Sequence, residues 1–289
     1  MKRKTAESLA IAYYRWKIEL MGFFSPRQAA KEAYRLFTIP PPPKQPLPDP
    51  RLPAAAPVSF PFRDFTIHGF RWDPPQPTGK KVLLMHGFRS HCLKFEHLAG
   101  ALMEKGYTVF GFDAPAHGRS GGKKIEAVTY REMILEADRQ FGPMLAGIGH
   151  SLGGLSLALA TELWPDPKNR LAVFIAPATE TTRSIAELFK IFPVRQAIRD
   201  AFNDIIMELA NLPVTHFSVN RVVQNIESPV LWIHDEEDFV CPLNDLQPSL
   251  DQHPPGVQFL ITKGLGHNQV YRDQAIVDRI VAFIHNPES

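Results

Sequence analysis

Short apolar runs alternate with helical patterns from about residue 58 onward. A run of four to six apolar residues between glycine, proline or polar residues is typical of a strand that is buried on both faces. Between these runs, apolar residues recur at helical spacing. The patterns predict strands near 65–72, 82–85, 107–112, 144–148, 171–176, 230–233 and 257–261, and helices near 93–105, 126–140, 152–163, 243–251 and 270–284. This alternation predicts an α/β fold with a mostly parallel central sheet and helices on both of its faces.

Residues from about 178 to 225 interrupt the alternation. They have helical patterns and no strand pattern, so we expect a helical insertion between two strands. Its apolar side chains either line a pocket for an acyl group or pack inside the protein, and the sequence leaves both interpretations open. The side chains concerned are Phe189, Ile191, Phe192, Ile198, Phe202, Ile205 and Met207.

The first 38 residues have the pattern of one or two amphipathic helices. We expect the first helix to end at Gly22, because glycine disfavours a helix interior. A second helix is expected after Ser25-Pro26, since serine is a favoured N-cap and proline is favoured at the first helical position. Large side chains such as Trp16 are costly to leave in water, so we expect this arm to pack on its own chain rather than to bind a membrane or a partner.

A proline-dense stretch follows from Pro40 to Pro61. Proline cannot occupy a helix interior or a central strand, so we expect an extended tether. The sequence therefore predicts a helical arm with a tether over residues 1–57 and an α/β domain over residues 58–289, which carries the helical insertion.

Composition and charge restrict the functional class. Of the 289 residues 44% are hydrophobic, which is enough to bury one large core. The formal net charge is +2, whereas nucleic-acid-binding domains are usually strongly basic, so we expect no nucleic-acid partner.

The two cysteines, Cys92 and Cys241, lie far apart in the sequence and neither belongs to a C-x-x-C pair. This spacing argues against a disulfide framework or a zinc site, and no H-E-x-x-H pattern is present, so we expect no metal and no cofactor. We find no segment with the pattern of a signal peptide or a transmembrane helix. These features favour a soluble, cytoplasmic protein, and no pattern indicates its oligomeric state.

The segment Gly149-His150-Ser151-Leu152-Gly153 has the form G-x-S-x-G. A buried-strand pattern precedes it and a helical pattern follows it, which is the setting of a nucleophile elbow. In such an elbow the serine lies at a turn so tight that side chains two residues away on either side would collide, and glycine avoids the collision. An ordinary tight loop can have the same five residues, so other residues of the chain are needed to distinguish it from a nucleophile elbow.

A serine hydroxyl is a poor nucleophile at neutral pH and requires a base. His267 follows the last predicted strand, and a neutral imidazole there could accept the serine proton and return it to the leaving group. A carboxylate has to orient such a histidine. The loop after the strand at 230–233 offers four acids, and the chemistry alone does not choose among Asp235, Glu236, Glu237 and Asp238.

These motifs resemble those of the α/β-hydrolase superfamily over residues from about 58 to 289, in the family's chain order of serine, acid and histidine. The matching segments are His86-Gly87-Phe88, Asp113 to Ser120, Gly149 to Gly154, the loop around Asp238, and Gly266-His267. In that family the acid usually precedes a short apolar stretch and a proline. Asp238 does so in the segment that ends at Pro242, so the resemblance selects Asp238 and leaves Asp235 as the alternative.

The resemblance implies a serine hydrolase that cleaves carboxylic esters or related acyl bonds of a small-molecule substrate through an acyl-enzyme, without a cofactor. It implies a catalytic triad of Ser151, Asp238 and His267, and an oxyanion hole formed by the backbone N–H groups of Phe88 and Leu152. Acyltransferases, thioesterases and peptidases use the same groups, and a non-catalytic binding protein could retain the fold.

Three other histidines, His86, His117 and His150, match family positions that usually hold loops through hydrogen bonds, and we expect that role here. The chain departs from the family at Ala116, where relatives commonly have glycine, and at Asp235, where a glycine often precedes the acid. We expect these departures to alter loop shape rather than catalysis.

Overall fold

The computed structural model of the chain describes residues 2–42, 49–52 and 55–287, with side chains from residue 8 onward. The chain divides into two compact units. One unit contains Met1–Ile39 and Glu180–Phe217, and the other contains Pro40–Thr179 and Ser218–Ser289. We call them the helical unit and the sheet unit. The predicted division into residues 1–57 and 58–289 stays a prediction.

The sheet unit is built on one mixed sheet, in which the described residues form eight strands in the order β1-β2-β4-β3-β5-β6-β7-β8. The strands are β1 (Ala55–Phe62), β2 (Phe65–Trp72), β3 (Lys81–Met85), β4 (Thr108–Phe112), β5 (Ala146–His150), β6 (Leu171–Ile175), β7 (Val230–Asp235) and β8 (Val257–Thr262). The pairs β1–β2 and β2–β4 are antiparallel, and the pairs from β4 through β8 are parallel. All seven predicted strands are therefore present, and β1 is added at the edge.

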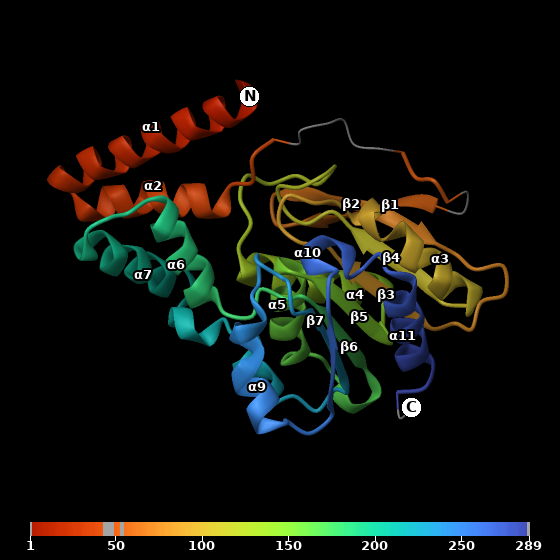
Figure 1. Cartoon of the computed structure of the whole chain (residues 1–289). Helices are drawn as coiled ribbons and strands as arrows, with labels where there is room; N and C mark the ends of the chain where they lie inside the picture. The colour runs from red at the N-terminus through yellow and green to blue at the C-terminus, as the bar shows by residue number, and fades with distance from the viewer. Residues whose placement is uncertain (1, 43–48, 53–54, 288–289) are drawn as a thin grey trace. The chain divides into compact units, whose positions relative to one another are not determined.

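Helices cover both faces of this sheet, as the alternation of side chains along each strand requires. The helices α3 (Glu96–Glu104) and α11 (Gln274–His285) contact each other and pack on the face that includes Val82 and Leu84. The helices α4 (Ala127–Phe141) and α5 (Leu152–Thr161) contact each other, and α5 also contacts β3, β5 and β6 (Figure 1). The predicted α/β fold class is confirmed.

Shorter elements complete the sheet unit and position several of its loops. They are η1 (Cys92–Phe95), η2 (Pro167–Asn169), α8 (Val219–Val223), η4 (Leu243–Leu246), α9 (Gln247–Gln252) and α10 (Gly266–Gln269). The loops that carry the predicted functional residues follow β3, β5, β7 and β8. Each begins at the carboxyl end of a parallel strand, which is the edge where ligands bind in open α/β sheets.

The helical unit joins the N-terminal arm to the insertion. It contains α1 (Lys2–Phe24), α2 (Pro26–Thr38), α6 (Thr181–Ile191), α7 (Gln196–Ala210) and η3 (Val214–His216). The ring of Phe202 on α7 meets those of Tyr34 and Phe37 on α2 at 5.7 and 5.8 Å and that of Phe189 on α6 at 5.2 Å. Of the seven apolar insertion residues named above, five are buried, whereas Ile191 and Met207 are exposed. Packing around Phe202 therefore accounts for most of them.

Two expectations about where the elements of the N-terminal region begin and end are wrong. Helix α1 continues through Gly22 to Phe24. Glycine at this position allows close packing, because a Cβ there would lie 2.5 Å from the Ile198 side chain. The proline-rich tether ends earlier than expected, since residues from Ala55 onward form β1, which among the described strands pairs with β2 alone. Proline is tolerated on such an edge strand because one side of the strand makes no ladder hydrogen bonds. Parts of the expected tether, 43–48 and 53–54, lie outside the described residues.

The predicted start of the second helix is confirmed, since the Ser25 side chain caps α2 by accepting a hydrogen bond from the Gln28 N–H and Pro26 is the first helical residue. The expectation that packing would cover the large side chains of the arm is wrong. Tyr13, Trp16 and Phe23 remain 55%, 60% and 75% exposed. In the described part of the chain, we find no helix with the length and apolar character needed to cross a bilayer.

Candidate active site

Ser151 lies at a strained turn between a strand and a helix. Strand β5 ends at His150, α5 begins at Leu152, and Ser151 between them has φ 55° and ψ −120°. A non-glycine residue rarely adopts a positive φ, and such strain is characteristic of functional turns. A Cβ at Gly149 would lie 2.5 Å from the Gly153 oxygen, so the glycines avoid the collision that the sequence pattern predicts.

The loop after β3 lies directly against this turn. A Cβ at Gly87 would lie 2.9 Å from the Ser151 Cβ, and one at Gly153 would lie 2.7 Å from the His86 oxygen. Phe88 follows Gly87 in this loop. Leu152 is the first residue of α5, so its N–H has no partner within the helix. The two predicted oxyanion donors thus belong to two segments that meet at Ser151.

His267 is hydrogen-bonded to Asp238. Its Nδ1 lies 2.7 Å from Asp238 Oδ2, while Asp238 Oδ1 accepts hydrogen bonds from the N–H groups of Val240 and Cys241, both at 2.8 Å. Burial alone would raise the pKa of the Asp238 carboxyl. The hydrogen bonds from His267 and the two N–H groups outweigh it, so this pKa lies below its ordinary value. Because Nδ1 is engaged with the carboxylate, Nε2 is the ring nitrogen left to accept a proton.

Asp235, the alternative acid, is occupied differently. It is fully buried, and its carboxylate accepts hydrogen bonds from the Thr262 hydroxyl and from the N–H groups of Glu237, Leu265 and Gly266, at 2.7 to 3.0 Å. It therefore fastens the loop that carries Asp238 to the loop that carries His267. This geometry favours Asp238 as the partner of His267 and gives Asp235 a positioning role.

Two further interactions involve the loops around Ser151. Burial raises the pKa of the Cys241 thiol to about 12, and the Ser151 side chain has a smaller opposing effect on it. The His150 ring lies 4.6 Å from the His267 ring, and its Nε2–H donates to the His267 carbonyl at 2.9 Å. The serine loop therefore contacts the histidine loop directly.

The expected loop-holding role of three histidines is confirmed. His86 bridges the Gly87 oxygen and the Ala114 N–H, at 2.8 and 2.9 Å. His117 bridges the Pro115 oxygen and the Arg89 N–H, at 2.9 and 3.0 Å.

The chain's departure at Ala116 has a local consequence in the same region. Ala116 has φ 61°, in the left-handed region that favours glycine. The backbone at this position therefore has the conformation for which the family's glycine is suited.

Burial keeps two of these histidines neutral. It lowers the pKa of His86 to about 4 and that of His150 to about 3, with smaller contributions from neighbouring imidazoles. An unfolded histidine titrates near ~6.5, so below this pH the unfolded chain binds protons that the folded chain excludes.

We therefore predict that stability falls on acidification. The contribution of the two rings to the free energy of unfolding is fully present above about pH 6.5. It decreases towards pH 4, by about 1.4 kcal/mol per pH unit for each ring. Urea unfolding from about pH 7 to about pH 5 checks this, and a constant free energy of unfolding would contradict it. In a His150→Gln variant the slope should be shallower by about 1.4 kcal/mol per unit.

Two residues near the site were not singled out from the sequence. His234 is buried at the end of β7, and its Nε2–H donates to the Cys241 carbonyl at 2.6 Å, which holds the acid loop closed. The Tyr271 ring lies 4.7 Å from the His150 ring. Its position four residues after His267 is the sequence feature that could have identified Tyr271 as a residue near the site. Among the described residues we find no group of His, Cys, Asp and Glu arranged to hold a metal ion.

The fold matches solved structures of α/β hydrolases. An esterase from Pyrococcus furiosus superimposes with a TM-score of 0.62 at 19% identity, covering 86% of this chain and 97% of the esterase. The chain has the α/β-hydrolase fold. A family model described as serine aminopeptidase, S33, matches residues 76–218 of this chain. That segment includes Ser151 and ends before Asp238 and His267.

Two curated proteins that are similar to this chain are named as an esterase/lipase and a lipase. A putative esterase/lipase from Mycoplasma pneumoniae is 23% identical over 266 residues, which are 80% of this chain and 97% of the relative. A monoacylglycerol lipase from Mycolicibacterium smegmatis is 32% identical over 91 residues, which are 29% of this chain and 32% of that lipase. The second match is therefore local.

Proposed function

We propose that this α/β hydrolase cleaves carboxylic esters through a covalent acyl-enzyme on Ser151. The observation that carries the proposal is the 2.7 Å hydrogen bond between His267 and a buried Asp238, formed beside a serine at φ 55°. This arrangement supplies a nucleophile, a base and an orienting carboxylate. The esterase and lipase names of the relatives support the same reaction class.

In the acylation step, Ser151 Oγ attacks the ester carbonyl carbon while His267 Nε2 takes the hydroxyl proton. The carbonyl oxygen becomes an oxyanion, which the N–H groups of Phe88 and Leu152 stabilise; one such donor is typically worth about 3 kcal/mol in the transition state. His267 then gives its proton to the alkoxide, and the alcohol leaves. Asp238 stabilises the imidazolium in between.

Deacylation repeats these roles with water. His267 takes a proton from a water molecule as that water attacks the acyl carbonyl, and it returns the proton to Ser151 Oγ when the tetrahedral intermediate collapses. The products are the carboxylic acid, the alcohol and the free enzyme. Every proton moves through His267, so the step needs no cofactor.

A fluorophosphonate probe tests the proposal directly. We expect covalent label on Ser151, located by peptide mass spectrometry, because only an activated serine attacks the phosphorus at a useful rate. Folded protein without label on Ser151 would contradict the proposal. The Ser156→Ala variant is a matched control on the same helix, and it should label like the wild type.

Amide cleavage is a second candidate, because the matching family model describes aminopeptidases. Comparison of p-nitrophenyl esters of increasing chain length with aminoacyl p-nitroanilides distinguishes the two. Turnover of esters without turnover of anilides supports esterase activity. The opposite result assigns the same catalytic groups to a peptidase.

A further inference from the structure

Among its described side chains, helix α1 has two apolar faces, and one of them is partly covered within the helical unit while the other is exposed. On the covered face Ile18 is fully buried and Gly22 packs closely against Ile198. Seven large apolar side chains of α1 are exposed; Ile11, at 43%, lies towards the side of Ile18, and the other six are exposed by 46% to 78%. They are Leu9, Tyr13, Trp16, Leu20, Phe23 and Phe24.

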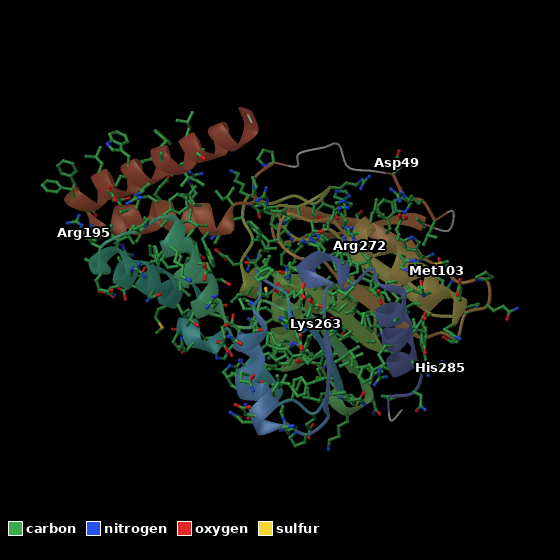
Figure 2. All side chains as sticks on the ribbon, in the orientation of Figure 1. Asp49, Met103, Arg195, Lys263, Arg272 and His285 are labelled. Atoms are coloured by element: carbon green, nitrogen blue, oxygen red, sulfur yellow. The ribbon has the colours of Figure 1, made fainter. Side chains whose placement is uncertain are left out.

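The six exposed side chains form one stripe. At 3.6 residues per turn they fall within an arc of about 100°, opposite Ile18. An arc of this width is typical of a helix face that is buried against something. Figure 2 shows ring-bearing side chains along α1 that project away from α2. We call these six residues the α1 stripe.

An ion cluster fixes which way the stripe faces. Glu32 on α2 is nearly buried and accepts hydrogen bonds from Lys17 of α1 at 2.7 Å and from Arg35 at 2.9 and 3.0 Å. The hydrogen bonds from Arg35 and Lys17 outweigh the effect of burial and lower the pKa of Glu32 to about 2, so the cluster stays ionised over the physiological range. Breaking it would leave a buried carboxylate without its partners, which opposes rotation of α1.

Charge indicates what covers the stripe. Residues 1–39 contain eight Lys and Arg against three Glu, a net charge of +5, whereas the whole chain carries +2. The remaining residues are therefore net acidic, at −3. A second copy would bring an equally basic arm to the stripe, and like charges would oppose that contact. An anionic surface is complementary to it.

The side chains of the stripe favour a lipid surface. Tyr13 and Trp16 each combine an apolar ring with a polar tip, which suits the boundary between headgroups and acyl chains. Phe23 and Phe24 are purely apolar and can enter the acyl region. We propose that α1 lies in the plane of an anionic phospholipid bilayer and inserts the α1 stripe into its surface.

The test uses the full chain and vesicles of phosphatidylcholine with about 30% phosphatidylglycerol, compared with phosphatidylcholine alone. We expect co-sedimentation with the anionic vesicles, weakened by high salt. Of the four tryptophans only Trp16 is exposed, since Trp72, Trp164 and Trp232 are buried. Acrylamide quenching of tryptophan emission should therefore decrease when the anionic vesicles are added.

A double variant, Trp16→Ser with Phe23→Ser, should bind the vesicles more than tenfold more weakly. Leu163→Ser removes an equally exposed apolar side chain from the sheet unit and should bind like the wild type. Circular dichroism checks that both variants are folded.

Absence of vesicle binding, or equal binding by the double variant, would overturn the proposal. So would lipid-free self-association that protects Trp16 and is lost in the double variant, because that result assigns the stripe to a second copy. These measurements involve no turnover, so they are independent of the proposed esterase reaction.

Discussion

Replacement of Ser151 by alanine should lower kcat/KM for ester hydrolysis roughly 10⁴- to 10⁶-fold. The variant lacks the atom that forms the acyl-enzyme, and water has to attack the ester directly. Residual activity would come from substrate binding and the oxyanion donors. The measurement is steady-state hydrolysis of a p-nitrophenyl ester at equal protein concentrations, and the fluorophosphonate probe counts active sites in the wild type and checks that the variant preparation has none.

The Ser156→Ala variant is the control for this prediction. Ser156 is buried on α5, and its hydroxyl has no hydrogen-bond partner among the described residues, so its removal should be neutral or slightly stabilising. It should keep wild-type kcat/KM. If Ser151→Ala retained activity within tenfold of the wild type, the acyl-enzyme mechanism would be wrong.

Asp238→Asn should reduce kcat by about 10⁴ without unfolding the protein. An asparagine can keep its place in the loop, because its carbonyl oxygen can still accept the N–H groups of Val240 and Cys241. Its amide nitrogen, however, would face His267 Nδ1 as a donor. The ring would then adopt the tautomer that protonates Nε2, and it could no longer accept the serine proton.

Glu237→Gln changes another acid of the same loop and should leave kcat within about twofold, since its exposed side chain lies outside the hydrogen bonds around His267. Thermal unfolding of both variants separates catalytic from structural loss. A wild-type kcat in the Asp238→Asn variant would contradict the assignment of Asp238 as the orienting acid.

The sheet could be predicted because its parallel strands are buried on both faces and appear as short apolar runs. The edge strand β1 could not, because Pro57 and Pro61 argue against a strand unless its edge position is known. Likewise, the local preference of glycine predicts a helix end at Gly22, whereas the close contact with Ile198 explains why glycine is accommodated inside α1. Both cases depend on a neighbour that is distant in the sequence.

At the candidate site, the glycine spacing was enough to locate the turn at Ser151, because the collision it prevents is local. The choice between Asp235 and Asp238 was not local. Strand β7 pairs with β8 so that Asp235 is opposite Thr262, which directs its carboxylate to the backbone of the next loop. Asp238 lies three residues further on and reaches the His267 ring. The chemistry of the four acids contains no information about that pairing, and Asp238 could be selected only through the resemblance to the family, by the apolar stretch that ends at Pro242.

The hydrogen bonds of Asp235 have a consequence for how this protein can diversify. They hold the acid and histidine loops in one fixed relationship, whereas the side chains of Phe239 and Val240 project from the same loop into solvent. Exchange of these two residues leaves the buried anchors in place. The loop thus combines buried anchors with an exposed rim, so substitutions of the Phe239 and Val240 side chains should leave the hydrogen bond between Asp238 and His267 in place.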